Sequence, residues 1–264
     1  MSKDVKIIIA AHKPFDVPKD TEMYLPIHVG SKGKDSIGFQ RDDELDNISS
    51  KNPFYCELTG LYWAWKNLDN DYIGLVHYRR YFAKKNKKYS ENLKIDEIIL
   101  DKEDVSKFLD ENDVIVPKKR KYYIESLYSH YAHTFDARHL DITRELISKQ
   151  CPEYLTSFEK VMQQRSGYMF NMFIMKKELL NEYLTWLFPI LDNLFEQVPV
   201  ENLTPFEARL FGRVSERLFN VWLDYKKIVP KEVPFVYLEK INYINKAKSF
   251  LEAKFFGKKY GQSF

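Results

Sequence analysis

The strongest constraint on how this chain folds is a short, mostly apolar run near its N-terminus, from Val5 to Ala11. The run is rich in β-branched residues and too short for a typical helix, which predicts a buried strand of a parallel sheet. His12, Lys13 and Pro14 follow at once and predict a loop. Open α/β sheets bind their ligands at the carboxyl ends of such strands, so a ligand site is expected near His12.

Two later segments repeat one pattern, in which an Asn-Asp turn precedes a buried strand and a basic cluster follows it. The strands cover residues 72–76 and 114–116. Asn52 and Pro53 predict the start of an amphipathic helix that reaches about Leu68. The remaining predicted elements are a helix over 153–164, a strand over 167–176, helices from 177 and over 205–225, a strand over 233–237 and a final helix. This alternation predicts an α/β fold with a mostly parallel central sheet flanked by helices.

Length and composition favour one large domain. With 264 residues and 44% apolar content, the chain can build a single α/β core. We therefore expect one domain over 1–240, followed by a basic amphipathic helix and tail over 241–264. The aromatic content of 16% suits a cleft lined by rings that stack on sugars or a base, although most such rings pack in cores. The net charge of +3 does not favour a nucleic-acid partner, which usually calls for a concentrated basic stripe.

The sequence gives no sign of export or of a membrane span. The N-terminal apolar run is shorter than a signal-peptide core and lacks a cleavage pattern. The longest apolar-rich stretch, over 183–195, is interrupted by a proline and two polar residues. Cys56 and Cys151 form neither a disulfide framework nor a metal cluster, as expected of a reducing compartment. We expect the protein to remain in the cytoplasm.

The clearest chemical signal is the cluster His77-Tyr78-Arg79-Arg80-Tyr81 at the end of the second strand. Two adjacent arginines are difficult to satisfy inside a core, and each offers a permanently charged, planar donor that matches phosphate oxygens. The cluster therefore predicts a site for an anion such as a diphosphate. The alternative is that the two arginines form structural ion pairs with the acidic 42–46 loop.

Other chemistries are poorly supported. His130, His133 and Asp136 suggest a metal or base site only weakly, and their spacing does not match a zinc enzyme. The chain contains no Gly-x-Ser-x-Gly elbow, no Gly-x-Gly-x-x-Gly and no phosphate loop. These gaps argue against a hydrolase, a nicotinamide enzyme and a kinase.

The most specific pattern lies in residues 55–67 and 71–82, which read Tyr-Cys-Glu-Leu-Thr-Gly-Leu-Tyr-Trp-Ala-Trp-Lys-Asn and Asp-Tyr-Ile-Gly-Leu-Val-His-Tyr-Arg-Arg-Tyr-Phe. With further matches at 26–30, 42–52, 171–174 and 216–218, the chain resembles a family of bacterial capsular and exopolysaccharide glycosyltransferases long catalogued as a domain of unknown function. The resemblance covers most of the chain. It implies a GT-A-like fold, a nucleotide-sugar donor that is UDP-linked and, in some members, transfer of galactofuranose.

The resemblance also implies roles for particular residues at the strand ends. These are His12 and Lys13 for the nucleotide, Asp42, Asp43 and Asp46 for the border of the donor, His77, Arg79 and Arg80 for the diphosphate, and Asn171 and Glu57 for a sugar. For Glu57 the alternative is a buried acid that is hydrogen-bonded for structural reasons.

The expected metal motif is displaced in this sequence. Many GT-A enzymes hold the donor diphosphate through a metal bound by Asp-x-Asp at a strand end. Here Asp69-Asn70-Asp71 precedes its strand, where such residues are ordinary turn formers. We therefore expect cationic side chains to assist departure of the nucleotide. Magnesium or manganese on the carboxylates of Asp42, Asp43 and Asp46 stays open.

An inverting transfer needs a group that accepts the proton of the acceptor hydroxyl. Glu216, in the predicted 205–225 helix, is the first choice. Its alternative role is an ion pair with Arg213 or Arg217 on the same helix. His133 with Asp136 is the reserve choice for the base.

The C-terminal stretch combines an apolar face with a basic one. Its apolar positions are Ile241, Ile244, Ala247, Leu251 and Phe255, and its basic ones are Lys246, Lys248, Lys254, Lys258 and Lys259. Such a helix can lie in a membrane interface, or it can pack on the enzyme with its lysines in solvent.

The sequence thus predicts a glycosyltransferase that moves a sugar, galactofuranose or another hexose, from a nucleoside-diphosphate sugar to a growing, lipid-linked polysaccharide. Its place would be the cytoplasm, at the inner face of the cell membrane. The alternative is a non-catalytic carbohydrate- or nucleotide-binding module of the same fold. A nucleic-acid-binding protein ranks last, because basic and aromatic residues alternate only near Tyr78.

Overall fold

The computed structural model describes residues 3–85 and 93–238. The described residues form two compact units. We call them the sheet unit, with residues 3–118, 170–185 and 229–238, and the helical unit, with residues 119–169 and 186–228. The predicted helix and tail over 241–264 lie outside the described residues, so the boundary at residue 240 stays a prediction.

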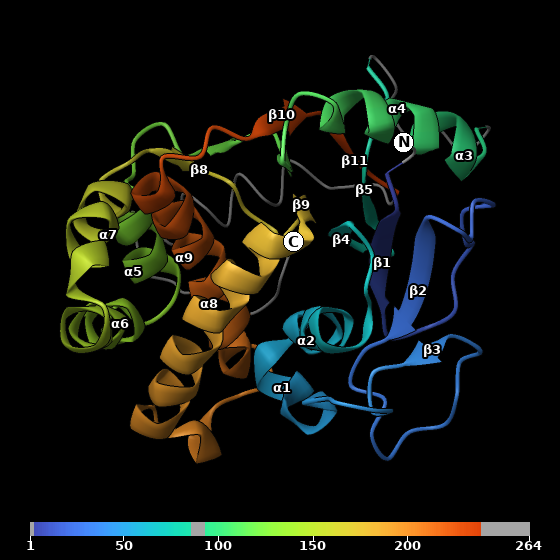
Figure 1. The fold of residues 1–264 in the computed structure, drawn as a ribbon. Helices are drawn as coiled ribbons and strands as arrows, with labels where there is room; N and C mark the ends of the chain where they lie inside the picture. Colours follow the sequence, from blue (N-terminus) through green and yellow to red (C-terminus); the bar gives the residue numbers. More distant parts are fainter. Residues whose placement is uncertain (1–2, 86–92, 239–264) are drawn as a thin grey trace. The chain divides into compact units, whose positions relative to one another are not determined.

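The sheet unit is built on one nine-stranded sheet, whose main path runs β10-β6-β9-β4-β1-β2-β3 (Figure 1). Strands β1 to β4 run parallel where they pair, as do β6 and β10. Strand β9 is antiparallel to both β4 and β6, and β5 joins β4 to β11. The bounds are β1 Val5–Ala11, β2 Tyr24–His28, β3 Gln40–Arg41, β4 Tyr72–His77, β5 Arg80–Phe82, β6 Val114–Pro117, β9 Phe173–Lys176, β10 Lys231–Val233 and β11 Phe235–Tyr237.

One face of the sheet is covered by helix α2, Leu58–Asn67. The helix approaches closely because it carries Gly60 at the contact. A Cβ on this residue would lie only 2.7 Å from a methyl carbon of Val29 and 3.8 Å from one of Ile8 in β1. The face of β1 that carries Ile8 is therefore the one that α2 covers.

The opposite face packs on helices α3, Ile95–Ile98, and α4, Lys102–Leu109. Ile7 and Ile9 of β1 belong to one buried cluster with Val105 and Leu109 of α4. An Asp101 capping box sets the start of α4, since its side chain accepts the Asp104 N–H at 2.9 Å. Helices thus cover both faces of β1, and the predicted α/β fold with a mostly parallel, helix-flanked sheet is confirmed.

The helix predicted over Pro53 to Leu68 is broken in the structure. It consists of α1, Asn52–Tyr55, and α2, with a left-handed Cys56 between them at φ 53 and ψ −130. The Asn52 side chain holds the break, because its amide donates to the Cys56 carbonyl at 2.8 Å and to Thr59 Oγ1 at 3.1 Å.

The strand predicted over 167–176 is interrupted as well. Its first part contributes to β8, Ser166–Gly167, and its last part is β9. Between them Phe170 and Asn171 adopt left-handed backbone conformations, with φ of 79 and 51. Neither residue can therefore continue a strand.

The helical unit contains a two-stranded sheet, formed by β7, Arg120–Lys121, and β8, and several helices. The helices are α5 Leu127–Thr134, α6 Arg138–Gln150, α7 Leu155–Met162 and α9 Leu210–Lys226, with the short 3-10 turns Pro152–Tyr154, Val200–Asn202 and Glu207–Arg209. Helix α8, Lys177–Gln197, has residues in both units. Tyr131, Phe211 and Trp222 are fully buried in this unit.

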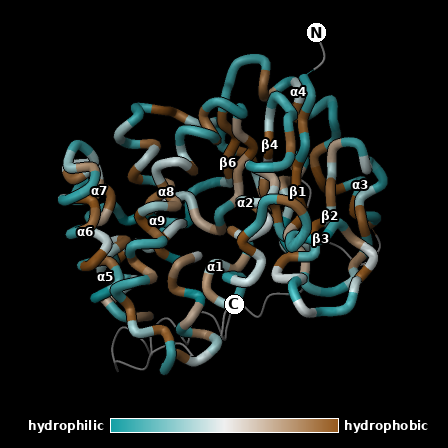
Figure 2. The backbone as a smooth tube through the Cα atoms, turned by 60° about the horizontal axis from the view of Figure 1, so that its bottom comes forward, coloured by the Kyte–Doolittle hydropathy of each residue, from teal (hydrophilic) through white to brown (hydrophobic). Residues whose placement is uncertain are grey.

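Hydropathy follows these assignments. In Figure 2 strand β1 is largely hydrophobic, whereas helices such as α6 alternate between hydrophobic and hydrophilic residues. This is the pattern of strands buried on both faces and of helices buried on one. Within the described ranges, no helix has the length and apolarity needed to cross a bilayer.

Candidate functional site

The carboxyl ends of the parallel strands meet at one edge of the sheet. In the register of the sheet Ala10 lies beside both Ile27 and His77, so β1, β2 and β4 end together. Strand β9 runs the other way and begins at this same edge, with Phe173 beside Leu75. This arrangement brings residues predicted from separate parts of the sequence to one edge: His12, Lys13, His77 and Asn171.

Three basic side chains surround the ring of Tyr78, which is buried (8% exposed). His12 contacts the ring edge-on at 5.2 Å between ring centroids, and Lys13 Nζ lies 5.4 Å from the ring centroid. Arg79 places its guanidinium carbon 5.2 Å from the same centroid. We call His12, Lys13 and Arg79 the Tyr78 cluster. All three are exposed, so the cluster presents positive charge that an anion can reach.

Arg80 lies in a different environment from its neighbour Arg79. Its guanidinium carbon is 3.9 Å from the ring centroid of Phe170 and 4.7 Å from that of Tyr237 in β11. Arg80 is half-buried among these rings. The two arginines predicted together at a diphosphate therefore divide into one exposed cation and one that packs against aromatic rings.

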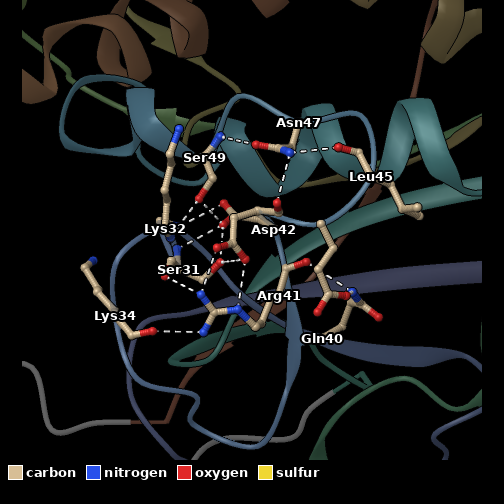
Figure 3. Close-up of polar contacts among 12 residues, drawn as sticks. Ser31, Lys32, Lys34, Gln40, Arg41, Asp42, Leu45, Asn47 and Ser49 are labelled. Atoms are coloured by element: carbon tan, nitrogen blue, oxygen red, sulfur yellow. Dashed lines mark hydrogen bonds and ion pairs between the residues drawn. The ribbon is translucent and has the colours of Figure 1, made fainter.

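Asp42 is fully buried in the loop after β3, where protein donors surround its carboxylate. Oδ2 accepts hydrogen bonds from Gly30 N at 2.8 Å and from Thr59 Oγ1 at 2.6 Å. Oδ1 accepts bonds from N and Oγ of Ser31, both at 3.0 Å, and from Ser49 Oγ at 2.5 Å (Figure 3). The residue predicted to border the donor thus ties the end of β2, the 42–49 loop and helix α2 together.

The neighbouring acids of this loop also have protein partners. Asp43 Oδ2 pairs with Arg41 Nη2 at 2.8 Å, and the hydrogen-bonded guanidinium lowers the pKa of Asp43 to about 2. Asp46 Oδ1 accepts the Tyr62 hydroxyl at 3.3 Å. Asp43 of this loop thus has Arg41, its neighbour but one, as an ion-pair partner.

These contacts test whether the loop fits a divalent metal. Magnesium and manganese bind through carboxylate oxygens, but those of Asp42 and Asp43 already accept hydrogen bonds from protein groups. The loop in this arrangement therefore does not fit a metal site. Over residues 3–85 and 93–238, no three His, Cys, Asp or Glu side chains are grouped as metal ligands would be.

The displaced Asp-x-Asp motif lies at the other end of β4. Asp71 Oδ2 accepts the Asp4 N–H at 3.0 Å, and Asn70 donates to the Asp4 carboxylate at 2.8 Å. Asp71 and His77 are six positions apart, which is roughly 20 Å along a strand. This position agrees with the interpretation of Asp69 and Asp71 as turn residues.

Glu57 and Asn171, the two residues predicted to bind a sugar, are in direct contact. Asn171 Nδ2 donates to Glu57 Oε1 at 2.7 Å. Left-handed residues flank the pair, with Cys56 before Glu57 and Phe170 before Asn171. His77 Nε2 lies 2.8 Å from the Phe170 carbonyl oxygen and supports that conformation. Strained non-glycine residues cost about 1–3 kcal/mol each and cluster at functional sites, which favours a site at this pair.

The predicted pairing of His133 with Asp136 is wrong. Asp136 instead accepts three hydrogen bonds from the Arg138 guanidinium, at 3.2, 2.9 and 2.6 Å, and these lower the pKa of Asp136 to about 2. The carboxylate partner of His133 is Glu125, whose Oε1 lies 2.7 Å from His133 Nδ1. Glu125 Oε2 contacts His130 Nδ1 at 2.8 Å. Asp136 is unsuited as a partner of His133 because its carboxylate is bound to the Arg138 guanidinium.

Glu125 is a buried acid (3% exposed) with two histidine partners. Burial raises the pKa of Glu125, but the hydrogen bonds from His133 and His130 outweigh it, so its pKa lies below the usual value. Burial lowers the pKa of His130 to about 4, which keeps that ring neutral at pH 7. A carboxylate that fixes Nδ1 of His133 leaves Nε2 as the atom able to exchange a proton.

Glu216, the first choice for the base, forms the ion pair that the sequence offered as its alternative. Arg217 Nη1 donates to Glu216 Oε2 at 2.9 Å and to the Arg213 carbonyl at the same distance. Arg217 is almost fully buried (3% exposed). The carboxylate of Glu216 is therefore engaged within α9.

Sequence reasoning missed several residues that organise these sites. They are Ser31, Ser49 and Thr59 around Asp42, Tyr237 beside Arg80, and Glu125 beside His133. Only Glu125 carried a readable signal. His130 and His133 are three positions apart, so they lie on one face of their helix. Helical side chains point back toward the N-terminus of the helix, and Glu125 lies there, just before the Ser126 cap. This spacing could have indicated that Glu125 contacts both histidines.

One solved structure, described as the apo structure of the bifunctional glycosyltransferase WbbM, is similar to this chain. The match has a TM-score of 0.83 and 32% sequence identity. It covers 90% of this chain and 46% of the other, so this chain spans about half the length of that protein. Among curated proteins, none matches this chain.

A family model described as "Domain of unknown function (DUF4422)" matches residues 6–227. The matched range contains the Tyr78 cluster, the Asp42 loop, the Glu57–Asn171 pair and the Glu125–His133 pair. A match of this extent includes most of the chain. The chain therefore belongs to the DUF4422 family.

Proposed function

We propose that this protein is a glycosyltransferase that moves a hexose, galactofuranose among the candidates, from a nucleoside-diphosphate sugar to a growing capsular or exopolysaccharide chain. The observation that carries the proposal is the similarity to WbbM, with 32% identity over 90% of this chain. That protein is described as bifunctional, and the matched 46% of its chain is long enough to hold one activity. The chemistry at the strand edge supports the same reaction class.

The Tyr78 cluster is our proposed site for the donor diphosphate. A departing UDP accumulates negative charge on its phosphate oxygens, and fixed cations stabilise that charge as it develops. Arg79 and Lys13 supply permanent positive charge, and His12 supplies a ring nitrogen. A charge-assisted hydrogen bond of this kind contributes about 1.5–3 kcal/mol. The exposed side chains of the cluster can contact the diphosphate without a bridging metal.

The Glu57–Asn171 pair is our proposed site for a sugar. Glu57 Oε1 accepts the bond from Asn171, and we assign Oε2 to a sugar hydroxyl. The pair joins a charged acceptor to an amide that can also accept through its oxygen. Its strained backbone supports a role in binding, because a structural hydrogen bond alone could be made without left-handed residues.

For the group that accepts the acceptor proton we propose His133, supported by Glu125. The buried carboxylate contacts Nδ1 of the ring at 2.7 Å and so fixes its tautomer and orientation, which leaves Nε2 for the acceptor hydroxyl. Glu216 is less suited, because Arg217 donates to its carboxylate. The two can be separated experimentally, since His133→Asn and Glu216→Gln should differ in the pH profile of transfer.

We further propose that residues 1–240 form the transferase domain, acting in the cytoplasm at the inner face of the cell membrane. An acceptor attached to a membrane lipid would be extended there. The segment 241–264, for which the sequence predicts an apolar and a basic helix face, would then contribute to membrane attachment.

The test is nucleotide binding followed by transfer. The purified protein is titrated with UDP, UDP-galactofuranose, UDP-galactopyranose and UDP-glucose while its melting temperature is recorded. A ligand at a hundred times its Kd adds about 2.7 kcal/mol to stability. At about 2–4 °C per kcal/mol this is a rise of roughly 5–10 °C. UMP, which lacks the second phosphate, should bind much more weakly.

Transfer is then measured as UDP release in the presence of a synthetic galactoside acceptor. Arg79→Ala should weaken UDP binding, whereas Arg144→Ala, which removes an exposed arginine paired with Glu159, should not. If no nucleoside diphosphate or nucleotide sugar binds, the proposal is wrong. Binding of the donor without transfer to any acceptor would identify a non-catalytic binding module instead.

A further inference from the structure

The 119–124 loop of the helical unit exposes two large apolar side chains. Tyr123 is 75% exposed and Ile124 is 54% exposed. Other large hydrophobic residues are exposed in the described part of the chain, but only these two are neighbours in sequence. Together they form an apolar tip on the surface.

The loop is firmly anchored below this tip. Tyr122, one residue earlier, is buried with its ring centroid 4.3 Å from that of His130. Its backbone N–H donates to the Arg165 carbonyl at 2.8 Å, and Leu127 N donates to the Gln164 carbonyl at 2.8 Å. The β7–β8 pairing holds the start of the loop. The tip is therefore held outward by ordered structure on both sides.

The backbone at the tip is strained. Tyr123 has a φ of 56, a left-handed conformation that glycine or asparagine adopts at lower cost. This turn allows Tyr122 to point inward while Tyr123 points into solvent. The fold therefore keeps an aromatic residue where both its conformation and its exposure are unfavourable, which points to a binding role for the ring.

Basic residues precede the apolar tip in the loop, and one more contacts it. Lys119, Lys121 and Arg165 are exposed, and Arg120 is partly so. Arg165 Nη1 donates to the Tyr123 carbonyl at 3.3 Å, which places one cation directly at the tip. Glu125, the acid that follows the loop, is buried and turned inward toward its histidine partners. Its charge is therefore withdrawn from the basic surface.

We propose that the 119–124 loop docks on an anionic lipid bilayer, with Tyr123 and Ile124 in the interface and the basic side chains at the lipid phosphates. Tyrosine favours this boundary, because its ring is apolar and its hydroxyl can remain hydrated. Lysine and arginine reach the headgroups while their stems lie along apolar surface. A single-stranded nucleic acid fits less well, because Ile124 offers no face on which a base can stack.

This docking surface is separate from the 241–264 segment and does not depend on the proposed transfer reaction. It is tested by sedimenting the full-length protein with phosphatidylcholine vesicles, with and without phosphatidylglycerol. The wild type should sediment with anionic vesicles only, and added salt should release it. Lys119→Gln and Lys121→Gln should each weaken binding about fivefold. Tyr123→Ser with Ile124→Ser should weaken it further at every salt concentration.

Matched controls separate the loop from general surface properties. Leu45→Ser and Val229→Ser remove side chains that are 75% and 90% exposed elsewhere, and they should leave vesicle binding unchanged. Lys107→Gln and Lys149→Gln remove exposed lysines of α4 and α6, and they should also bind as the wild type does. In a protein whose lysines in 241–264 are replaced, the loop substitutions should still weaken vesicle binding.

A fluorescence measurement covers the case in which a loop variant folds poorly. The Tyr123→Trp variant adds one tryptophan at the tip, and subtracting the wild-type spectrum isolates the emission of that residue. This emission should shift to the blue when anionic vesicles are added. An unchanged spectrum, or loop variants that sediment like the wild type, would overturn the proposal. It would also be overturned if the variants lost affinity for a single-stranded oligonucleotide or a soluble glycan and still bound vesicles normally.

Discussion

Replacing Asp42 by asparagine should destabilise the protein strongly, whereas the same change at Asp43 should have little effect. Asparagine keeps one acceptor oxygen and turns the other into an amide that donates. If the amide takes the place of Oδ2, Gly30 N–H loses its acceptor, and if it takes the place of Oδ1, Ser31 N–H does. The serine and threonine hydroxyls can rotate and accept from the amide, but a backbone N–H cannot.

The structure sets the size of this effect. A buried N–H without an acceptor costs about 1–3 kcal/mol, and each bond to a charged acceptor weakens by about 1 kcal/mol when the acceptor becomes neutral. When the amide replaces Oδ1, one unsatisfied N–H and the two weakened bonds to Oδ2, from Gly30 and Thr59, give a loss of about 3–5 kcal/mol. At about 2–4 °C per kcal/mol, the melting temperature should fall by roughly 6–20 °C. Asp43 and Arg41 are partly exposed, so Asp43→Asn should cost about 1 kcal/mol or less.

Thermal and urea unfolding of both variants give the comparison, and UDP binding is measured on the same samples. We expect the Asp42→Asn variant to be less stable than the wild type. The fraction that remains folded should bind UDP with near wild-type affinity. Equal melting temperatures for the two variants would refute the structural role of Asp42. A normal melting temperature combined with lost UDP binding would instead make this carboxylate part of the donor site.

Arg79→Ala should lower kcat/KM for the donor about 10- to 150-fold without lowering the melting temperature, whereas Arg80→Ala should lower both because it leaves the Phe170 and Tyr237 rings uncovered. Identical melting temperatures for the two would contradict this division. Glu57→Gln keeps an acceptor for Asn171 and removes the charge, so its unfolding should match the wild type while turnover falls at least about tenfold; wild-type kinetics would mark Glu57 as structural. Because burial lowers the pKa of His130 from 6.5 to about 4, the unfolded chain takes up a proton that the folded chain excludes, and stability should decline as the pH falls from 6.5 toward 4. In urea titrations His130→Gln should flatten that decline, and equal slopes would count against it. Turnover should survive exhaustive chelation, since protein donors engage the Asp42 and Asp43 carboxylates, and a complete loss restored by manganese would show that a metal is required.

Several strands of the central sheet could be predicted because the residues that make them strands are neighbours in sequence. Strands β1, β4 and β6 are buried on both faces, so their sequences are short apolar runs that fit few other structures. The charged clusters after β1 and β4 could be placed at one edge for the same reason, since parallel strands share their direction. The resemblance, which assigned His12 to the nucleotide and His77 to the diphosphate, agrees with this placement.

The breaks in these elements could not be predicted, because their causes lie elsewhere in the chain. The left-handed turn at Phe170 is supported by His77, which is 93 positions away. The break at Cys56 is held by the Asn52 side chain, whose bond to Thr59 also belongs to the environment of Asp42. A periodic pattern cannot report contacts of this kind, so one smooth helix and one long strand were predicted in their place.

Pairings of charged residues were predicted by proximity, which anticipated the Glu216–Arg217 ion pair but failed for His133. Asp136 lies close to His133 in sequence but binds Arg138, while Glu125, on the far side of the histidine, makes the contact. The loop acids were likewise expected at the donor, yet Asp42 is wholly buried. A carboxylate on a loop can serve a ligand or the fold, and its burial decides between them.

Strand β9 gives this protein a particular order of assembly. It lies between β4 and β6, yet it is synthesised only after the whole 119–169 segment. Until then β4 and β6 each lack a neighbour, and an apolar strand with an open edge can pair with another chain. Closing such a long loop costs entropy before any contact is gained, which slows folding. Chains interrupted before β9 should therefore aggregate or depend on chaperones, and translation rate through residues 119–176 should influence the yield of folded protein.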